Sequence, residues 1–403
     1  MKNRVVITGQ GAISALGKNI KENCNSLKDS FCGIDQLEIP GIERLSIKVG
    51  AYVKNYDEKN FFSKQEVSYY DRYTQFALLA AKEAFKDSGL IISDNLRDHV
   101  GVVLGNSGGG LHTQDENFRN VYEFQKNRVH PFVVPRLMNS AAASHLSINF
   151  KARGPSFTVS TACASSNHAM GQAFKLIQSG SLIAAFTGGS ESMLCFGGIK
   201  AWEGLRVMSP DFCRPFSANR NGMIQGEGSA IFIFEEYEHA KKRGAEIIAE
   251  VIGFSMSSDA SDIVKPNLEG AKRTMINALK DAKISSKNID YINAHGTGTL
   301  LNDKVECNAI KDIFKENLKK LFVSSTKSMH GHLIGGSGAI EMVSCLLALK
   351  ENVISPTINY EKFDPDCDLN IVPNEPIKSE VKYVMSNSFA FGGMNAVLVL
   401  KKI

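Results

Sequence analysis

The chain has 403 residues, and its 43% hydrophobic and 22% charged residues are ordinary proportions for a globular protein. Its formal charge of +4 is spread thinly, with basic residues only in pairs such as Lys241 and Lys242, so nucleic-acid binding is not expected. A chain of this length exceeds what one hydrophobic core usually organises, which indicates two domains or two closely joined halves.

The first residues and the cysteines are typical of a cytoplasmic protein. The opening stretch MKNRVVITGQGAISALG lacks the sustained apolar core of a signal peptide. No run approaches 18 apolar residues, so no membrane span is expected. None of the eight cysteines forms a C-x-x-C pair, which argues against a zinc ribbon or a disulfide framework and favours free thiols in a reducing compartment.

Apolar runs alternate with amphipathic segments along most of the chain, which predicts an α/β fold. In chain order, strands are expected at Arg4–Thr8, Val100–Leu104, Phe157–Ser160, Leu182–Thr187, Ala230–Glu235, Ile289–Asn293, Phe322–Ser325 and Ala396–Leu400. Helices are expected at Tyr73–Asp87, Ser165–Gln178, Gly270–Ala282, Lys304–Phe314 and Ile340–Lys350.

A weak internal similarity supports two related halves. RVVITGQGAISALG near the start and IIAEVIGFSMSSDA at 247–260 both read as a strand followed by small and hydroxyl residues. STACASSN and NAHGTGT each follow a further strand in the same manner. We place the boundary near residue 250, giving halves 1–250 and 251–403, and expect them to pack closely because no Pro/Ser linker separates them.

Cys163 lies between a predicted strand and a predicted helix, in TVSTACASSNHAM. Such a turn leaves backbone N–H groups unpaired, and these groups and the helix dipole are expected to lower the pKa of the thiol. Small neighbours would let a substrate approach. A packed core cysteine remains an equal alternative on this stretch alone.

Two further strand ends carry histidines. His295 follows the strand IDYIN within NAHGTGT, and His330 and His332 follow LFVSST within SSTKSMHGHLIGGSGAIE. The carboxyl ends of strands are where ligands bind in α/β sheets, so these segments are expected to meet at one site with Cys163. A metal site and a cysteine hydrolase with a Cys-His pair both remain open, although no fourth zinc ligand is evident.

Four motifs in order, TACASS, NAHGTGTLLND, SSTKSMHGHLIGGSGAIE and NSFAFGGMN, resemble the elongating β-ketoacyl-acyl-carrier-protein synthases of the thiolase superfamily. RPFSANRNGMIQGEGSAIFIFEEYEHAKKRG matches the same family between the first two motifs, and the resemblance covers essentially the whole chain. It implies a thiolase-like α/β fold, in which two pseudo-twofold-related βαβ-rich halves form a five-layered α-β-α-β-α core. It also implies a decarboxylative Claisen condensation between an enzyme-bound acyl group and malonyl-carrier protein.

The resemblance also implies a role for each matching residue. Cys163 is the expected nucleophile, and His295 and His332 are the expected pair that promotes decarboxylation of the malonyl group. Lys327 and Glu341 would form a buried pair that orients His332. The backbone N–H groups of Cys163 and Phe391 would form an oxyanion hole, and Phe389 and Phe391 would be the hinge and gate aromatics of a mobile loop over the cysteine. Thr297 and Thr299 would contact the pantetheine arm of the carrier protein.

The resemblance implies that no metal or redox cofactor is required and that the substrates are carried on the 4'-phosphopantetheine of an acyl carrier protein. The resemblance implies a dimer paired through the strand that leads to the nucleophile, with a copy or with a chain-length-factor-like homologue. PFVVPRLMNSAAASHL at 131–146, including Val133 and Val134, matches the segment that closes the neighbour's acyl pocket.

Several positions depart from the fatty-acid pattern. Gly108 stands where an isoleucine gate usually limits the acyl pocket, which suggests a deeper or differently shaped tunnel. Ala390 and Met394 replace the usual Gly and Thr, and His330 replaces the usual Thr. Gly108, together with residues 219–228, in which the RNG sequence is closer to that of polyketide ketosynthases, favours a specialised type II polyketide or polyene ketosynthase.

Three alternatives are kept at this point: housekeeping fatty-acid elongation, a thiolase, and a noncatalytic chain-length factor. A thiolase needs a second cysteine near the carboxyl terminus, and none follows Cys367. A chain-length factor lacks the cysteine that Cys163 supplies.

Overall fold

The computed structural model describes residues 2–403. Ten of its strands form one mixed sheet with the order β10-β9-β13-β14-β8-β1-β7-β6-β4-β5. From one edge to the other these strands are Phe322–Ser324, Tyr291–Asn293, Tyr383–Ala390, Met394–Lys401, Ala249–Ser258, Val5–Ser14, Gly228–Glu236, Ala184–Glu191, Val100–Gly105 and Ser156–Val159. Two short ribbons lie outside this sheet and pair β2 (Asp35–Gln36) with β3 (Val49–Gly50) and β11 (Val353–Ile354) with β12 (Ile377–Lys378).

The sheet consists of two five-stranded halves with the same pattern of pairing. In the first half β5, β4 and β6 are parallel, and β7 and β1 follow in antiparallel pairs. In the second half β10, β9 and β13 are parallel, and β14 and β8 follow in antiparallel pairs. The halves join where Val5–Ile7 of β1 pairs antiparallel with Ala249–Val251 of β8. This arrangement confirms the thiolase-like α/β fold with two related halves.

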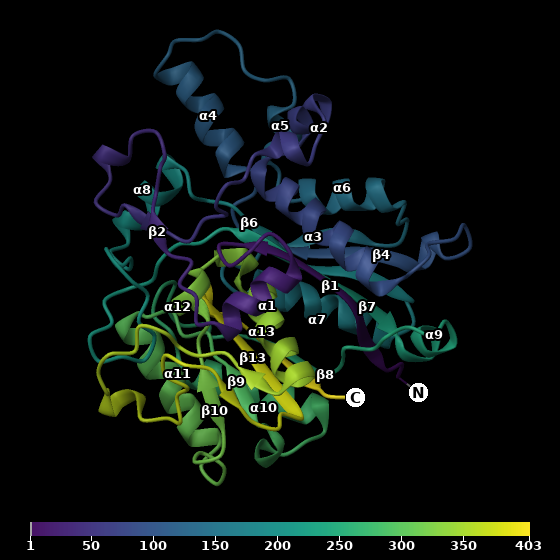
Figure 1. Ribbon diagram of the computed structural model, residues 1–403, viewed down its shortest axis with the longest axis vertical. Helices are drawn as coiled ribbons and strands as arrows, with labels where there is room; N and C mark the ends of the chain where they lie inside the picture. Colours follow the sequence, from purple (N-terminus) through teal and green to yellow (C-terminus); the bar gives the residue numbers. More distant parts are fainter. Residues whose placement is uncertain (1) are drawn as a thin grey trace.

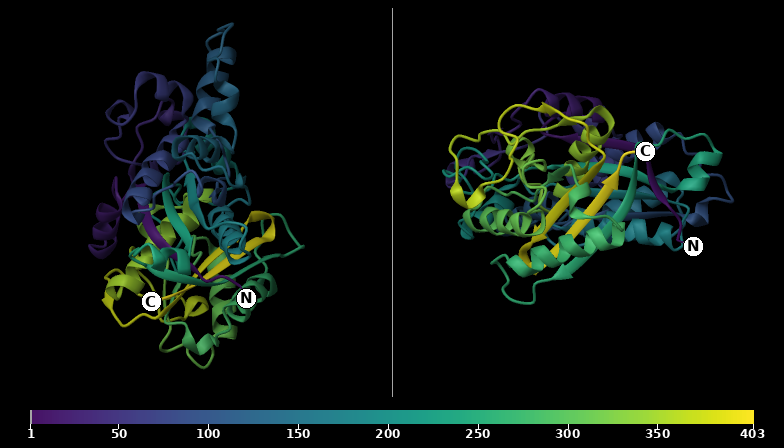
Figure 2. Two further views of the ribbon diagram at one scale, coloured as in Figure 1. Left: turned by 90° about the vertical axis from the view of Figure 1, so that its right-hand side faces the viewer. Right: turned by 90° about the horizontal axis from the view of Figure 1, so that it is seen from below.

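Helices fill the three layers around and between the two halves of the sheet (Figures 1 and 2). α7 (Ser165–Gln178) and α13 (Ser337–Glu351) pack against each other and against strands of both halves, so they form the central layer. α3 (Arg72–Ser88) and α6 (Ala141–Phe150) cover the outer face of the first half, and α10 (Leu268–Ala282) and α11 (Leu300–Ile313) that of the second. The remaining helices are α1 (Ile20–Lys28), α2 (Lys64–Tyr69), α4 (Leu111–Tyr122), α5 (Val133–Leu137), α8 (Phe196–Gly204), α9 (Tyr237–Lys242) and α12 (Lys327–His330).

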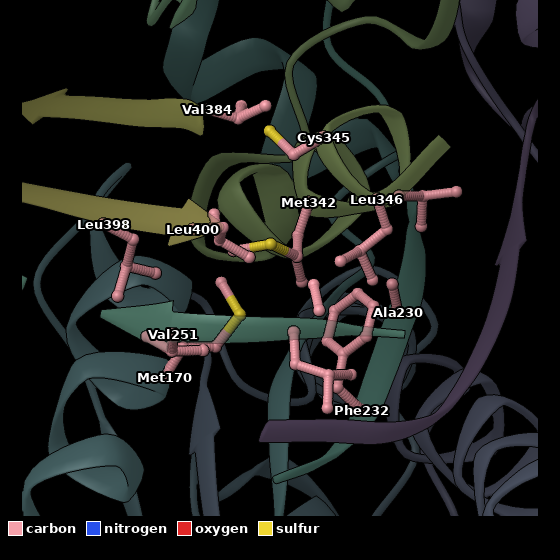
Figure 3. Packing of buried hydrophobic residues seen from close by; sticks show 14 of the residues in the cluster. Met170, Ala230, Phe232, Val251, Met342, Cys345, Leu346, Val384, Leu398 and Leu400 are labelled. Carbon is pink, nitrogen blue, oxygen red and sulfur yellow. The ribbon is translucent and has the colours of Figure 1, made fainter. Parts of the chain in front are cut away.

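The central helices explain why the two halves act as one body. α13 is buried at every position from Ser337 to Leu349, because it has sheet on more than one side. Figure 3 shows Met342 and Leu346 of this helix packed with Phe232 of β7 and with Leu398 and Leu400 of β14. Fully burying side chains of this size contributes about 1.5–3 kcal/mol each.

The predicted elements are present with shifted ends. β1 extends well beyond Arg4–Thr8 to Ser14, and α11 begins at Leu300, four residues before the predicted start. β13 (Tyr383–Ala390) was not among the predicted strands, although it pairs with β9 and β14 inside the sheet. The division near residue 250 stays a prediction, and β8 crosses it without an interruption.

Two surface features bear on assembly. α4 and the segment that follows it project from the body of the protein (Figures 1 and 2). β5 forms one edge of the sheet, with one side unpaired. Within residues 2–403, none of the helices has the length and apolar character needed to cross a bilayer.

Candidate active site

Cys163, His295 and His332 lie together at the base of a cavity of about 260 Å³. One ring nitrogen of each histidine and the Cys163 sulfur lie within 4.8 Å of one another. The three residues come from loops after β5, β9 and β10, so the expected convergence of strand ends is confirmed. The cavity wall includes Trp202, Thr297, Thr299, Asn302, Phe389 and Phe391.

Cys163 is held in a tight turn between β5 and α7. Ala162 has a φ of 47°, in the left-handed region that residues with a side chain rarely adopt. The Ser165 hydroxyl donates to Ala162 O at 2.7 Å and accepts from Thr161 N at 2.9 Å, which closes the turn. The backbone N–H groups of Phe391 and of Cys163 itself act on the thiol and favour its ionised form, which lowers its pKa.

The pKa of the Cys163 thiol is raised to about 11, so the expectation of a lowered pKa was wrong. Burial disfavours the thiolate, and this effect outweighs the charge of Lys327 and the two backbone N–H groups, which act in the opposite direction. A helix start and unpaired N–H groups can be read from the sequence, but the loss of water around the sulfur cannot.

His332 is fixed by two contacts to its Nδ1 atom. The Ile334 backbone N–H donates to Nδ1 at 3.0 Å, and the Ser337 hydroxyl lies 2.7 Å from the same atom. A backbone N–H can only donate, so Nδ1 accepts and the proton of the neutral ring is on Nε2. Nε2 is buried and has no partner within the described residues, which leaves it free to donate to a substrate atom.

His295 has the same tautomer for a different reason. Lys327 Nζ lies 3.5 Å from His295 Nδ1, and an ammonium group can only donate, so Nε2 of this ring also carries the proton. Burial and the charge of Lys327 lower the pKa of both His295 and His332 well below the ordinary value. The site therefore presents two neutral imidazoles, each with an N–H donor, rather than imidazolium ions.

Lys327 and Glu341 form a fully buried ion pair, as expected, but the pair does not orient His332. Lys327 Nζ donates to the carbonyl oxygen of His295 at 2.6 Å and faces that ring. His332 is held by Ser337 and Ile334, which follow it along the chain. The expected role was therefore assigned to the wrong histidine, because the motif shows both partners without showing which ring they face.

The group of Cys163, His295 and His332 also has donor atoms that a metal could use. Among residues 2–403 no fourth His, Cys, Asp or Glu ligand joins this group, and the Lys327 ammonium faces His295. A closed structural zinc site needs a fourth protein ligand, and a nearby ammonium repels a cation at any zinc site. These residues therefore fit an anion-stabilising site better than a metal site.

The other predicted residues fall into two sets. The hydroxyl oxygens of Thr297 and Thr299 lie 2.8 Å apart at the cavity wall. Phe389 meets His295 edge-on with ring centroids 6.2 Å apart, and Phe391 stacks on Trp202 at 5.9 Å. Ala390 has φ −113° and ψ 156°, an extended conformation that alanine adopts without strain.

Gly108, Val133 and Val134 are not among the residues that line this cavity. A Cβ atom added to Gly108 would lie 2.0 Å from Met193 Cε, so the methionine fills the space that a larger residue would take. The deeper or differently shaped tunnel expected from glycine at this position stays a prediction, and Met193 occupies the space directly beside it. Val133 is buried at the start of α5, and Val134 is exposed.

Sequence reasoning missed several residues that shape the site. Glu306 of α11 accepts the backbone N–H groups of His295 at 2.9 Å and Gly296 at 2.8 Å. Trp202, the only tryptophan of the chain, packs on the expected gate residue Phe391. Ser337 lies five residues after His332 inside the quoted motif, so its proximity was readable, whereas Glu306 and Trp202 depend on the tertiary fold.

His330 is separated from the chemistry by its own bonds. Its Nδ1 contacts Gly331 O at 2.8 Å, and its Nε2 contacts the Thr326 hydroxyl at 2.9 Å. Both ring nitrogens are occupied, so His332 rather than His330 serves the cavity.

Comparison with known proteins agrees with this geometry along the whole chain. Residues 2–240 match the model of the beta-ketoacyl synthase N-terminal domain, and residues 248–361 match that of its C-terminal domain. The chain is 42% identical to Nodulation protein E of Rhizobium leguminosarum bv. trifolii, and the match covers 100% of both chains. It is 41% identical to 3-oxoacyl-[acyl-carrier-protein] synthase 2 of Staphylococcus aureus (strain N315), over 99% of this chain and 98% of that protein.

Solved structures give the same result. The ishigamide ketosynthase/chain length factor superimposes with a TM-score of 0.94 at 31% identity, covering 100% of both chains. A second matching structure is that of a type II polyketide synthase acyl-carrier protein in complex with its ketosynthase bound to the hexaketide. Its matching chain has a TM-score of 0.90 at 31% identity, again over 100% of both chains. The protein belongs to the β-ketoacyl synthase family and is an acyltransferase of the 3-oxoacyl-carrier-protein synthase class.

Proposed function

We propose that Cys163 carries the growing acyl chain and that His295 and His332 promote the decarboxylation that drives its extension by two carbons. In the first step the Cys163 sulfur attacks the carbonyl carbon of an acyl thioester, and the proton of the thiol leaves with the departing carrier thiol. In the second step the carbon–carbon bond to the malonyl carboxylate breaks and CO2 departs. The resulting enolate attacks the acyl carbonyl, and the Cys163 sulfur leaves as a thiolate and takes a proton from solvent.

The observation that carries this proposal is the convergence of a ring nitrogen from each histidine on the Cys163 sulfur, in rings whose Nδ1 contacts leave the proton on Nε2. Decarboxylation places negative charge on the thioester oxygen, and neutral imidazole N–H groups can donate to that oxygen. The N–H groups of Cys163 and Phe391, which already contact the thiol, would hold the oxyanion that forms at the acyl carbonyl. Two separate oxyanion sites match a reaction with two separate charged intermediates.

The substrates in this proposal arrive on the 4'-phosphopantetheine of an acyl carrier protein. The hydroxyls of Thr297 and Thr299 lie at the cavity wall above His295, where they can bond to amide groups of such an arm. A carrier protein bound to its ketosynthase in a matching structure supports the same partner.

We assign the chain to a specialised type II polyketide or polyene pathway. Three observations support this choice: the full-length similarity to Nodulation protein E, the type II polyketide synthase ketosynthase among the matching structures, and the departures at Gly108 and at residues 219–228. Housekeeping fatty-acid elongation is the second candidate, supported by the equally extensive match to 3-oxoacyl-[acyl-carrier-protein] synthase 2.

An assay of turnover distinguishes the two candidates, in which polyenoyl or polyketide carrier substrates are compared with saturated chains of matched length. Exclusive turnover of saturated chains would contradict our assignment.

The division of roles gives a first prediction. Cys163→Ala should abolish condensation and retain malonyl-carrier decarboxylation, whereas His332→Ala should lower decarboxylation by about 10²–10³ because it removes an oxyanion donor. Release of labelled CO2 and formation of the β-ketoacyl product measure the two steps. His330→Thr, outside the donor set, serves as the control and should retain both. Condensation by Cys163→Ala would disprove the nucleophile assignment.

The raised pKa of Cys163 gives a second prediction. Well below a pKa of about 11 the thiolate fraction rises about tenfold per pH unit, so alkylation of Cys163 by iodoacetamide should accelerate about a hundredfold from about pH 7 to 9. Peptide mass spectrometry at each pH measures the rate constant. Cys24, whose pKa is also raised to about 11, provides an internal reference. A rate for Cys163 that levels off below about pH 8 would show that a preformed thiolate exists.

The contact between Met193 and Gly108 gives a third prediction. Met193→Ala should open the space beside Gly108 and raise the relative kcat/KM for longer acyl chains, because the thioether at present fills it. A competition assay with carrier-bound acyl chains of increasing length measures the shift. Met256→Ala, an exposed methionine on β8, is the control. An unchanged chain-length profile would place the end of the acyl chain elsewhere.

We further propose that the chain forms a dimer through the edge of the sheet at β5. This edge and the neighbouring α4, α5 and 123–132 segment expose an unusual number of large apolar side chains, namely Phe118, Tyr122, Phe124, Val129, Phe132, Val134, Met138 and Phe157. Exposed apolar surface of this kind, next to an unpaired strand, marks an association site. The ketosynthase/chain length factor among the matching structures supports a partner of the same fold.

The fourth prediction tests this surface. The wild-type chain should have twice the chain mass by light scattering, and the double variant Phe132→Asp/Val134→Asp should have the mass of a monomer, because buried carboxylates cost free energy. Phe363→Asp, at an exposed site elsewhere, should remain a dimer. A monomeric wild type would exclude self-association, and copurification with a chain-length-factor-like homologue would then test the heterodimer.

A further inference from the structure

Glu191 is a fully buried carboxylate with no assigned role, at the end of β6. One oxygen accepts from Asn106 Nδ2 at 2.9 Å and from Gly108 N at 3.2 Å. The other accepts from Ser107 N at 2.8 Å and from Gly335 N at 3.1 Å. Burial raises the pKa of this carboxyl to about 8, while the N–H donors act in the opposite direction. The four donors are three backbone N–H groups and the Asn106 amide, and they favour the ionised carboxylate, whereas burial favours the protonated form.

The carboxylate joins two segments that are far apart in sequence. Asn106, Ser107 and Gly108 follow β4, whereas Gly335 lies in η5 (Ile334–Gly336), directly after His332. A Cβ atom added to Gly335 would lie 2.7 Å from Glu191 Oε2 and 2.6 Å from Ser107 N. Glycine at this position therefore allows the backbone to approach the carboxylate closely.

Gly335 is also held from the side of the nucleophile. Its carbonyl oxygen accepts from the Ser166 hydroxyl, in the first turn of α7 and three residues after Cys163. The peptide units on both sides of this glycine are thus clamped, the N–H by Glu191 and the carbonyl by Ser166.

The residue before Gly335 connects this clamp to His332. Ile334 has a φ of 47°, which is a strained conformation for a β-branched residue. In that conformation its backbone N–H donates to His332 Nδ1 at 3.0 Å, the bond that places the ring proton on Nε2. Such strain persists only where surrounding contacts hold it, and Glu191 bonds to the very next peptide unit.

We infer that Glu191 is a positioning residue: by binding the Gly335 N–H it holds Ile334 in its left-handed conformation and keeps His332 in the tautomer that donates from Nε2. This inference rests on the proposed function, since it assigns His332 the role of donor to the malonyl thioester. Glu191 itself does not touch the reacting atoms.

The experiment compares malonyl-carrier decarboxylation with acylation of Cys163 in Glu191→Gln. Glutamine keeps one acceptor oxygen and turns an NH2 group toward the other pair of donors, so it can no longer accept from both segments at once and its hold on the Gly335 N–H should weaken. We expect kcat for decarboxylation to fall at least about tenfold. One oxyanion donor typically raises kcat by about 10²–10³, and in this variant the His332 donor would be misplaced for part of the time. Acylation of Cys163 by an acyl-carrier thioester, which does not need His332, should change less than about threefold, in keeping with its separate oxyanion donors.

A second readout reports on the ring directly. In protein labelled with ¹⁵N-histidine, the wild type should show His332 with a proton on Nε2 only, and Glu191→Gln should show a mixture of the two tautomers. A residue that only supports the fold would not produce this change.

Matched variants make the outcome decisive. Glu235→Gln removes the charge of another buried carboxylate, on β7, which bonds to Thr8, His239 and Arg243 and not to the site. It should leave the ratio of the two steps unchanged. If Glu191→Gln does not fold, Ser166→Ala releases the same glycine from the other side and should show the same selective loss of decarboxylation.

Equal loss of both steps, or no loss, in the folded variant overturns the role of Glu191. A wild-type protein without decarboxylation would instead contradict the proposed function, so the two failures are distinguishable.

Discussion

The buried ion pair of Lys327 and Glu341 sets the electrostatics of the whole site. Both side chains are fully buried, and an ammonium in such surroundings needs its counter-charge, because removing one partner of a buried pair costs about 3–5 kcal/mol. The same ammonium bonds to the carbonyl of His295 and faces its ring. Its charge lowers the pKa of both histidines and of the Cys163 thiol, although burial outweighs it at the thiol. The imidazoles stay neutral, which makes them hydrogen-bond donors rather than acids.

The related halves of the sheet bring these groups to one place. Cys163 follows β5 in the first half, whereas His295 follows β9 and Lys327 follows β10 in the second half. β9 and β10 occupy the same positions in the second half as β4 and β5 occupy in the first. α7 and α13 lie between the halves, so the turns that begin them are adjacent. Ser166 of α7 and Gly335, two residues before α13, touch directly. Cys163 and the two imidazoles are thus held by elements that meet at the centre of the protein.

Much of the fold and site was predictable from particular stretches of sequence. The residues of the two central helices, the strand ends before Cys163 and His295, and the buried pairing of Lys327 with Glu341 all follow from motifs. The rest was not predictable for physical reasons. The pKa of Cys163 depends on the exclusion of water from the sulfur. The ring that Lys327 faces and the space beside Gly108 each depend on a neighbour distant in sequence. Met193, which fills that space, lies 85 residues after Gly108 along the chain.

The sequence by itself determined which chemical groups are available: one cysteine at a strand-to-helix turn, two histidines after parallel strands, and a lysine and a glutamate spaced within one motif. Local residue type and spacing are enough for this, because they decide where strands end and helices begin. Only the tertiary structure decided the protonation of these groups and the direction in which each donates. Burial set the pKa of Cys163, and backbone contacts from Ile334, clamped through Gly335 by Glu191, set the tautomer of His332. Those properties depend on solvent exclusion and on neighbours brought together by folding.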